Sequence, residues 1–228
     1  MKLSVLIPVY DEKPTIEIIL QKIRAVPVEK ELIMVDDFSK DGSREILKEI
    51  ESRNEPDLKI LYHDKNQGKG AAIRTGLKEV TGDYVLIQDA DLEYDPNDYL
   101  DLIQALQKNK ADVVYGSRFL GVCKNMSLSH YFGNKLLTFM ANLLYGTKLT
   151  DIETCYKLWK KDLIKSIDFK ANRFEFEPEI TSKMLKKNIK IIEVPIHYDA
   201  REFDQGKKIS WKDGFSSLWT LIKYRFKS

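Results

Sequence analysis

The chain has 228 residues, of which 43% are hydrophobic, so it can bury a sizeable core, and a mostly disordered chain is excluded. Its formal net charge of +2 argues against a nucleic-acid-binding protein of the usual basic kind. The two cysteines, Cys123 and Cys155, lack the spacing of a zinc site, and so few thiols favour a reducing compartment.

Apolar strands alternate with helical patterns from the first residues to about residue 118. The pattern predicts strands at 2–10, 31–37, 58–64, 83–89 and 111–118, and helices at 14–26, 39–53, 71–80 and 96–108. Repeated units of this kind form a mostly parallel sheet with helices on both faces. The predicted fold class is therefore α/β.

The pattern is looser after residue 120. We expect an amphipathic helix at 129–146, a turn and strand at 150–162, a strand running into a helix at 174–188 and a last strand at 190–200. No change of composition marks a linker, so residues 1–210 are predicted to form one domain, followed by a C-terminal helix at 211–228. The first apolar run is too short for a signal peptide, and no run reaches the roughly 18 apolar residues of a membrane span, so we expect a soluble or surface-associated protein.

Four carboxylates occupy every second position after the fourth strand, in the stretch "LIQDADLEYDP" at 86–96. They are Asp89, Asp91, Glu93 and Asp95, and the period of a strand would point them to one face. Like charges so close repel each other unless a cation lies among them. We predict Mg²⁺ or Mn²⁺, because hard divalent ions bind carboxylate oxygens together with substrate phosphates. The alternative is a solvated turn, which suits Asp95 best because it precedes Pro96 at a helix start.

Two further strand ends carry polar residues, and ligands of parallel sheets bind at such ends. In "VDDFSKDGS" at 35–43, Asp37 could accept hydrogen bonds from a ribose or a base, or it could cap a helix or form a turn. The stretch "NQGKGAAIRTG" at 66–76 is neither a Walker loop nor a GxGxxG loop. Gly68 and Gly70 would still allow the backbone before a helix to approach an anion closely.

Taken in this order and at these distances, "SVLIPVYDE", "VDDFSKDGS", "NQGKGAAIRTG" and "QDADLEYDP" resemble the family 2 glycosyltransferases of the GT-A fold. The later stretches "VVYGSRF" and "TDIETCYKLW" are similar to the polyprenyl-phosphate sugar synthases, such as the dolichyl-phosphate mannose synthases. The resemblance covers about residues 2–210 and is most specific up to Arg118. It implies an inverting transferase, dependent on Mg²⁺ or Mn²⁺, that moves a hexose from GDP-mannose or UDP-glucose to a polyprenyl phosphate.

The resemblance also assigns roles to the residues at matching positions. It implies a donor site made of Pro8, Tyr10, Glu12, Asp37, Lys69, Asp89 and Ala90. It implies that Asp89 and Asp91 bind the metal, with Glu93 facing it. The catalytic residues that it implies are Asp91, Arg118 and Asp151, the last in a segment that closes over the sugar. The chain departs from the pattern in two places, since Asp11 replaces an Asn and "QGKKISWKDG" at 205–214 lacks a Gly-x-Ser-Lys stretch.

The acceptor decides whether a general base is needed. A polyprenyl phosphate is already anionic and needs a cationic clamp. For this clamp we predict Arg118 and, as weaker candidates, Arg201, Lys207 and Lys208. A hydroxyl acceptor must lose a proton, and Asp151 or Glu153 would then be the base. A nucleotide-sugar-binding protein without turnover is a third hypothesis, and the intact pair of metal-type aspartates weighs against it.

The last residues combine aromatic and basic side chains, in "SWKDGFSSLWTLIKYRFK" at 210–227. Such a helix suits the interface of a membrane, although it could equally pack on the domain. The helix at 129–146 could be a second membrane contact or part of the core. We therefore expect a peripheral protein at the cytoplasmic face of a membrane, whose partners are a nucleotide-diphospho-sugar, a polyprenyl phosphate and the membrane surface, and not nucleic acid.

Overall fold

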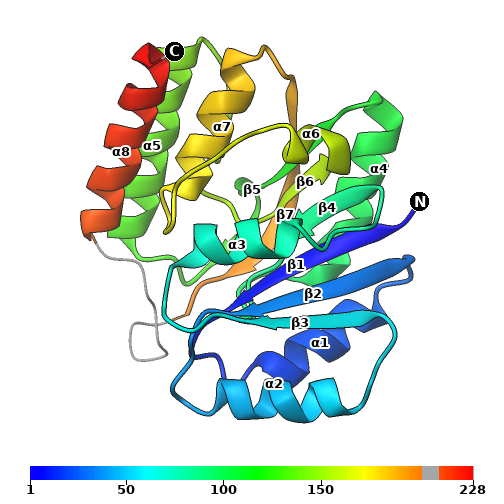
Figure 1. The fold of residues 1–228 in the computed structure, drawn as a ribbon. Helices are drawn as coiled ribbons and strands as arrows, with labels where there is room; N and C mark the ends of the chain where they lie inside the picture. The colour runs from blue at the N-terminus through cyan, green and yellow to red at the C-terminus, as the bar shows by residue number, and fades with distance from the viewer. Residues whose placement is uncertain (202–210, 228) are drawn as a thin grey trace.

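A computed structural model describes residues 1–201 and 211–227, and within them a seven-stranded sheet runs through the molecule (Figure 1). Its strands are β1 (Leu3–Val9), β2 (Lys30–Asp36), β3 (Leu58–Tyr62), β4 (Tyr84–Ile87), β5 (Val113–Lys124), β6 (Lys157–Lys160) and β7 (Ile191–Asp199). They lie in the order β3-β2-β1-β4-β6-β5-β7. Neighbouring strands pair in parallel except β6, which is antiparallel to β4 and β5. The prediction of a mostly parallel sheet is confirmed.

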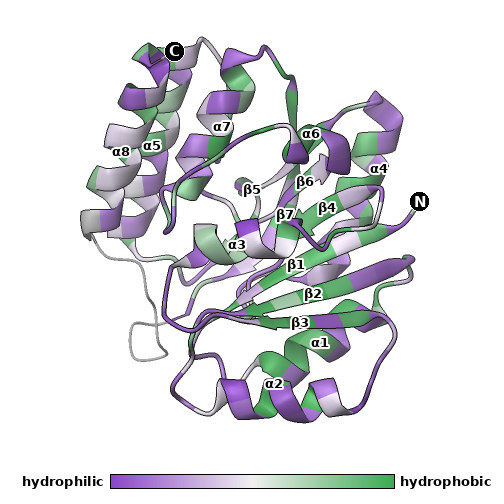
Figure 2. Cartoon of the chain, in the orientation of Figure 1, coloured by the Kyte–Doolittle hydropathy of each residue, from purple (hydrophilic) through white to green (hydrophobic). Residues whose placement is uncertain are grey.

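Strand β1 lies inside the sheet and is buried on both faces. Val5 and Ile7 are buried on one face, and Leu6 is buried on the other. This explains why its sequence is a continuous apolar run rather than an alternating one. Figure 2 shows the hydrophobic residues gathered along β1 and β2. Val9 at the end of β1 pairs with Asp36 at the end of β2, so both strands deliver the chain to the same edge.

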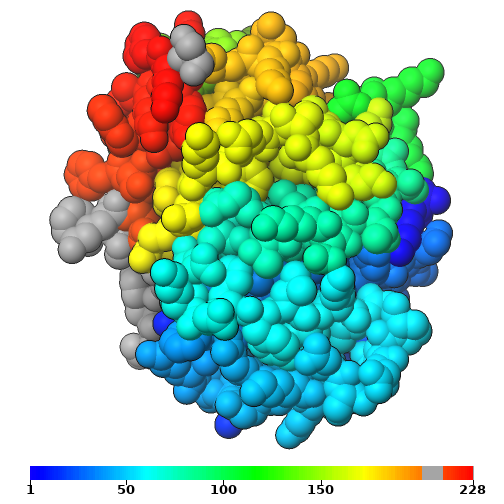
Figure 3. All heavy atoms as spheres, in the orientation of Figure 1, coloured from blue at the N-terminus to red at the C-terminus, as the bar shows by residue number. Residues whose placement is uncertain are grey.

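Helices cover the sheet on both sides, as predicted. They are α1 (Ile16–Ala25), α2 (Ser43–Ser52), α3 (Lys69–Leu77), α4 (Tyr99–Asn109), α5 (Leu128–Tyr145), α6 (Lys161–Lys165), α7 (Phe176–Lys186) and α8 (Trp211–Phe226), with a short 3₁₀ turn η1 at Pro96–Asp98. Figure 1 shows α3 on one side of β1–β3 and α1 with α2 on the other. Figure 3 shows that α3 and the segment between β6 and α7 fill the space in front of the sheet.

Helices α5, α7 and α8 pack on one another. Their shared core contains Leu137, Ala141, Leu149, Ile152 and Leu221. The Tyr145 hydroxyl donates a hydrogen bond of 2.8 Å to the carbonyl of Leu221, which ties α8 to α5. In the part of the chain that the structure describes, none of the helices combines the length and the hydropathy needed to cross a membrane. The domain boundary at residue 210 lies outside the described residues and stays a prediction.

Two predicted elements differ from the structure. Residues 174–175 form a turn, not the end of a strand, because Pro178, Glu177 and Glu179 occupy the first turn of α7, where proline and acids favour a helix start. Helix α2 begins at Ser43 rather than at residue 39. The intervening residues turn at the sheet edge, and Gly42 there has a φ of 101°.

Candidate active site

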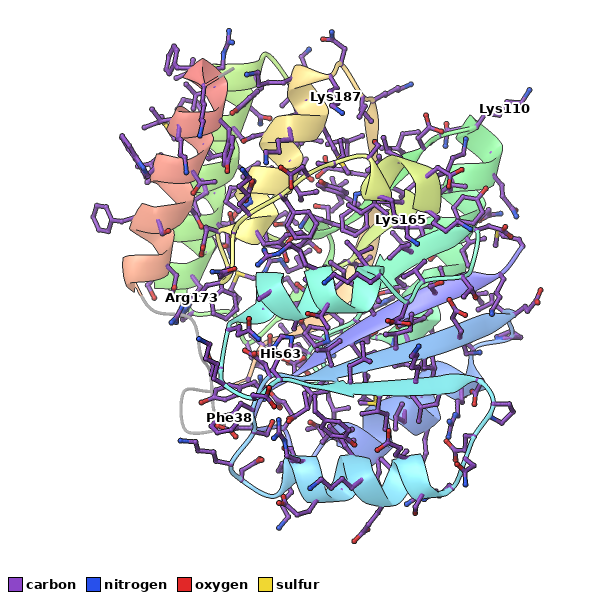
Figure 4. All side chains as sticks on the ribbon, viewed as in Figure 1. Phe38, His63, Lys110, Lys165, Arg173 and Lys187 are labelled. Carbon is purple, nitrogen blue, oxygen red and sulfur yellow. The ribbon has the colours of Figure 1, made fainter. Side chains whose placement is uncertain are left out.

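The carboxyl ends of the parallel strands meet at one edge of the sheet, and most of the predicted site residues lie there. Glu12 follows β1, Asp37 follows β2, Asp89 and Asp91 follow β4, and Arg118 lies within β5. Figure 4 labels Phe38 and His63 at this edge. The prediction that the strand ends converge is therefore confirmed.

One guanidinium contacts three carboxylates at this edge. Nη1 of Arg201 lies 2.8 Å from Glu12, and its Nη2 lies 2.9 Å from Asp91. Its backbone N–H donates a hydrogen bond of 2.8 Å to Glu93. Glu12 and Asp91 are each only 7% exposed. Arg201, predicted as a weaker candidate for the acceptor phosphate, thus sits among the carboxylates expected to hold the donor and its metal.

A lysine neutralises the remaining carboxylate of the predicted metal pair. Nζ of Lys69, at the start of α3, lies 2.8 Å from Asp89 and 3.5 Å from Glu177. This places Lys69 in the donor region, where it was expected. Asp95 is different, because its carboxylate accepts a hydrogen bond of 3.0 Å from the N–H of Asn97 and caps η1. The turn alternative therefore holds for Asp95.

Four of the predicted site carboxylates are gathered around two basic side chains at this edge. Four carboxylates, Glu12, Asp89, Asp91 and Glu93, share Arg201 and Lys69. Burial, followed by repulsion from Asp89 and Glu93, raises the pKa of Asp91 to about 8. Mg²⁺ and Mn²⁺ bind hard carboxylate oxygens that lie this close together and would displace the Asp91 proton, so the residues fit such an ion chemically. As they stand, no three acidic, His or Cys side chains among the described residues are grouped to ligate one.

Asp37 binds the loop that leads into α3. Its carboxylate accepts hydrogen bonds of 2.8 Å and 2.6 Å from the N–H groups of Gln67 and Gly68. It also lies 2.7 Å from Nδ1 of His63. The resemblance implies a nucleoside contact for Asp37, and in this structure its oxygens hold the 63–68 segment at the sheet edge. These bonds span 26 to 31 positions of the chain, so they are not the local turn considered above, and the nucleoside contact stays a prediction.

The glycines of the 66–70 loop are explained by close backbone packing. A Cβ at Gly68 would come within 2.4 Å of the carbonyl oxygen of Asn172, and one at Gly70 within 2.4 Å of that of Ala171. Gly68 also has a φ of 97°. Both glycines therefore let the loop pack against the segment before α7, a reason that applies without any bound anion.

The turn after β1 explains the departure from the family motif. Asp11 has a φ of 50°, a conformation in which Asn and Asp are the most frequent residues after Gly. Its carboxylate accepts a hydrogen bond of 2.7 Å from the N–H of Lys40. The Thr15 hydroxyl donates to the carbonyl of Ala90 at 2.8 Å and ties this turn to the one after β4. Two other residues assigned to the donor site flank the turn: Pro8 lies within β1 and Tyr10 follows it.

Arg118 and Asp151 form a buried, bidentate ion pair. Nε and Nη2 of Arg118 each lie 2.7 Å from the Asp151 carboxylate, and its backbone N–H donates to the same group at 3.1 Å. Arg118 is 5% exposed and Asp151 is 0% exposed. The Asp151 N–H is itself held by Glu193 at 3.0 Å. Two of the three residues predicted to be catalytic are thus adjacent, but each satisfies the other.

Sequence reasoning missed Lys157 and Glu177, which lie beside the site. Lys157 is fully buried, and its ammonium pairs with Glu177 at the start of α7. Glu177 lies in turn near Lys69, so this pair adjoins the donor region. A charged residue inside the apolar stretch "CYKLW" was the available signal. Two weaker candidates for the acceptor phosphate, Lys207 and Lys208, lie outside the described residues.

A model of glycosyl transferase family 2 matches residues 4–168. The chain belongs to this family. It is therefore a glycosyltransferase, as the resemblance implied, and the sheet with its antiparallel β6 is a GT-A fold.

Two curated relatives of this family 2 glycosyltransferase match it along most of its length. A UDP-N-acetylglucosamine–dolichyl-phosphate N-acetylglucosaminyltransferase of Methanococcus voltae is 29% identical over 95% of this chain and 93% of its own. A dolichol-phosphate mannosyltransferase of Pyrococcus furiosus is 29% identical over 91% of this chain but 59% of its own. These names support the resemblance to polyprenyl-phosphate sugar transferases.

Solved structures confirm the fold. Glucosyl-3-phosphoglycerate synthase of Mycobacterium tuberculosis, in complex with Mn²⁺, uridine diphosphate and glucosyl-3-phosphoglycerate, superposes with a TM-score of 0.73. The two chains are 18% identical, and the match covers 98% of this chain and 79% of the other. At this identity the likeness concerns the GT-A architecture alone.

Proposed function

We propose that this family 2 glycosyltransferase moves a hexose from a nucleotide-diphospho-sugar to a polyprenyl phosphate, with inversion at the anomeric carbon. The anomeric carbon–oxygen bond to the diphosphate breaks, a phosphate oxygen of the acceptor forms the new bond from the opposite face, and the nucleoside diphosphate leaves. The names of the relatives support the acceptor class. Donor candidates are GDP-mannose and UDP-glucose, to which the Methanococcus voltae relative adds UDP-N-acetylglucosamine.

The observation that carries the choice of acceptor is the Arg118–Asp151 pair. A hydroxyl acceptor needs a base with a free carboxylate oxygen. Both oxygens of Asp151 bind Arg118, and the carboxylate is fully buried. Burial, with Glu177 nearby, raises the pKa of Glu153 to about 8, so this second candidate is mostly protonated at neutral pH. A phosphate acceptor needs neither base, and this favours the lipid phosphate.

Arg118 and Arg201 are the proposed clamp for the acceptor phosphate. Asp151 fixes Arg118 through Nε and Nη2, which leaves Nη1 for an incoming anion. Arg201 adjoins the segment at 202–210 and now binds Glu12 and Asp91. If a cation takes over those carboxylates, Arg201 is released to bind the acceptor phosphate or the donor diphosphate.

Asp89 and Asp91, with Glu93 beside them, are the proposed ligands of Mg²⁺ or Mn²⁺. Their closeness to one another after β4 supports this assignment, since Asp91 and Glu93 both contact Arg201 and Asp89 contacts Lys69. Such an ion would supply positive charge to the departing diphosphate. The chain's own residues orient the site: Thr15 links the turns after β1 and β4, and Asp37 holds the loop that carries Lys69.

We also propose that the protein lies on the cytoplasmic face of a membrane through α5 and α8. Large apolar side chains are exposed on α5, on the end of β5 and on α8: Leu128, Phe132, Leu136, Phe139, Leu143, Leu120, Val122, Phe215, Trp219 and Phe226. We call these the apolar face. Helix α5 carries no acidic residue, and basic side chains follow on α8, which suits an anionic lipid surface. Both cysteines are free thiols, which supports a reducing compartment.

A row of rings links this apolar face to the site. The ring of Phe119, next to Arg118, lies 5.3 Å from that of Tyr131, which lies 5.5 Å from that of Phe132. Nζ of Lys135 is 3.9 Å from the centre of the Phe119 ring. A polyprenyl chain could therefore follow apolar side chains from the bilayer to the Arg118 clamp.

Radiolabelled donors test the proposal. Each of the three donors is incubated with short polyprenyl phosphates and Mn²⁺ or Mg²⁺, and label is counted in the solvent-extractable lipid. We expect label from one donor, and we expect chelator to abolish its transfer. Asp151→Asn should retain transfer to the lipid, because the bidentate ion pair with Arg118 serves the structure and a phosphate acceptor needs no base. Transfer to a sugar hydroxyl that collapses in Asp151→Asn or Glu153→Gln would favour the hydroxyl acceptor. Donor binding without consumption would favour a binding protein.

Vesicle sedimentation tests the apolar face. Phe132→Ser with Leu136→Ser should abolish binding to vesicles that contain phosphatidylglycerol, because two anchoring side chains are lost. Leu100→Ser is the matched control, since Leu100 is also exposed but lies on α4. Equal binding by both variants would contradict this membrane assignment.

A further inference from the structure

Glu153 has a buried carboxyl oxygen to which none of the described residues donates a hydrogen bond. Its Oε1 is buried, and it has no hydrogen-bond partner among the described residues. Oε1 of Glu177 is also buried without a hydrogen bond there, although Nζ of Lys69 lies 3.5 Å away. A buried polar atom without a partner costs free energy, so its retention points to a partner that binds there.

Glu153 lies between the two halves of the site. Its pKa responds to the charges of Glu177 and Lys157 beside Lys69 and to those of the Arg118–Asp151 pair. Glu177 connects through Lys69 to Asp89, one of the proposed metal ligands. Glu153 also lies in the chain between Asp151, which pairs with Arg118, and Cys155, whose Sγ lies 3.6 Å from the carbonyl of Ile87 at the end of β4.

The cations around Glu153 are already paired. Nζ of Lys157 binds Glu177 and the carbonyl of Thr154, and Arg118 binds Asp151. Burial and the charge of Glu177 raise the pKa of Glu153 to about 8, so it carries a proton at neutral pH. A protonated carboxyl both donates and accepts a hydrogen bond. The partner that fits is a neutral hydroxyl, which also donates and accepts.

We propose that Glu153 binds a hydroxyl group of the hexose that is being transferred and thereby sets which sugar the enzyme accepts. This inference rests on the proposed function, since it needs a nucleotide-diphospho-sugar in the site. Glu153 is a specificity-determining residue in this account and neither a base nor a metal ligand. A site built to bond a hydroxyl discriminates against a sugar that lacks it, because the buried carboxyl is then left without its partner.

Calorimetry separates the sugar contact from the nucleotide contact. UDP-glucose, UDP-N-acetylglucosamine and GDP-mannose are titrated with Mn²⁺, each beside its free nucleoside diphosphate. We expect Glu153→Ala to lower the affinity for the sugar nucleotide that the wild type binds by about tenfold. The affinity for the free nucleoside diphosphate should be unchanged. Glu153→Gln keeps the shape of the side chain and most of its hydrogen bonding, so it should lower this affinity less than Glu153→Ala does. Glu49→Ala is the control, because Glu49 is exposed on α2.

Deoxy donors give a readout that a purely structural role would not change. Removal of the hydroxyl that Glu153 binds should weaken wild-type binding about as much as Glu153→Ala does, and it should cost the variant nothing further. The inference would be overturned if Glu153→Ala lost equal affinity for the free diphosphate and for the sugar nucleotide, or lost affinity for neither. So would additive losses for every deoxy donor. If the wild type binds no sugar nucleotide at all, the proposed function itself fails, which is a distinct result.

Discussion

The proposed donor side and the proposed acceptor side of the active site both combine carboxylates with basic side chains, but they differ in the ratio of acidic to basic groups. On the donor side, four carboxylates share Arg201 and Lys69. On the acceptor side, Arg118 and Asp151 satisfy each other one to one, fully inside the protein. Among the described residues, the proposed donor side thus gathers several carboxylates around each basic group, whereas the Arg118 guanidinium on the proposed acceptor side is matched by a single carboxylate. Residue type predicts which chemistry is present, and the balance of partners decides how much of it is available.

The largest expected effect comes from breaking the balanced pair. Arg118→Met leaves Asp151 as a buried charge without a partner, and we expect the free energy of unfolding to fall by about 3–5 kcal/mol. Urea unfolding measures this. The double variant Arg118→Met, Asp151→Leu removes both charges and should recover most of the stability while lipid transfer stays absent. A double variant as unstable as the single one would contradict the one-to-one description.

The donor side should respond in the opposite way, with function lost and stability kept. Asp91→Asn replaces a carboxyl whose ionisation burial, Asp89 and Glu93 all oppose, so the fold should tolerate it. Transfer should fall by about 100-fold, since one proposed ligand of the ion beside the diphosphate is gone. Asp95→Asn is the matched control, because it keeps the cap on η1. A similar loss of transfer in both variants would point to the turn rather than to the charge.

Most of the fold and the location of the site could be predicted from the sequence. Uninterrupted apolar runs such as "SVLIPV" reflect strands that are covered on both faces, and the strand ends then fix where Asp37, Asp89 and Asp91 lie. The alternating stretch "FEFE" gave a wrong strand because period-2 alternation outweighed Pro178 as a helix-start signal. Burial of a strand is visible in the apolar residues of a single short segment, so the strands could be predicted from the sequence.

The pairing of charges could not be predicted, since it joins residues far apart in the chain. Arg201 meets Glu12 across 189 positions, and Glu177 meets Lys157 from a separate helix. Asp37 was expected at a nucleoside, and the structure shows its oxygens holding the 63–68 segment. The spacing of residues along the chain does not indicate which of several acidic side chains pairs with a given arginine. The roles of these residues therefore depend on the folded arrangement.

Removing Arg201 tests whether the donor side competes for cations. Arg201→Ala frees Glu12 and Asp91, so Mn²⁺ no longer displaces a guanidinium, and its affinity should rise by about tenfold. Electron paramagnetic resonance of free Mn²⁺ measures this. Arg173→Ala is the control, because that arginine is largely exposed and pairs with Asp213. Unchanged affinity in Arg201→Ala would show that the carboxylates are not the cation site.

The last prediction concerns Glu153, the carboxyl proposed to bind the sugar. Its pKa is raised from 4.5 to about 8 in the folded protein, so folding favours its protonated form. The stabilisation is complete below about pH 4.5 and is lost as the pH rises towards 8, because the unfolded chain then releases the proton more readily. Glu153→Gln cannot lose a proton, so its melting temperature relative to the wild type should be about ten degrees higher at pH 9 than at pH 5. Glu49→Gln should show no such difference, and a difference of the opposite sign for Glu153→Gln would mean that Arg118 and Lys157 stabilise an ionised Glu153, which would then be available as the base that a hydroxyl acceptor requires.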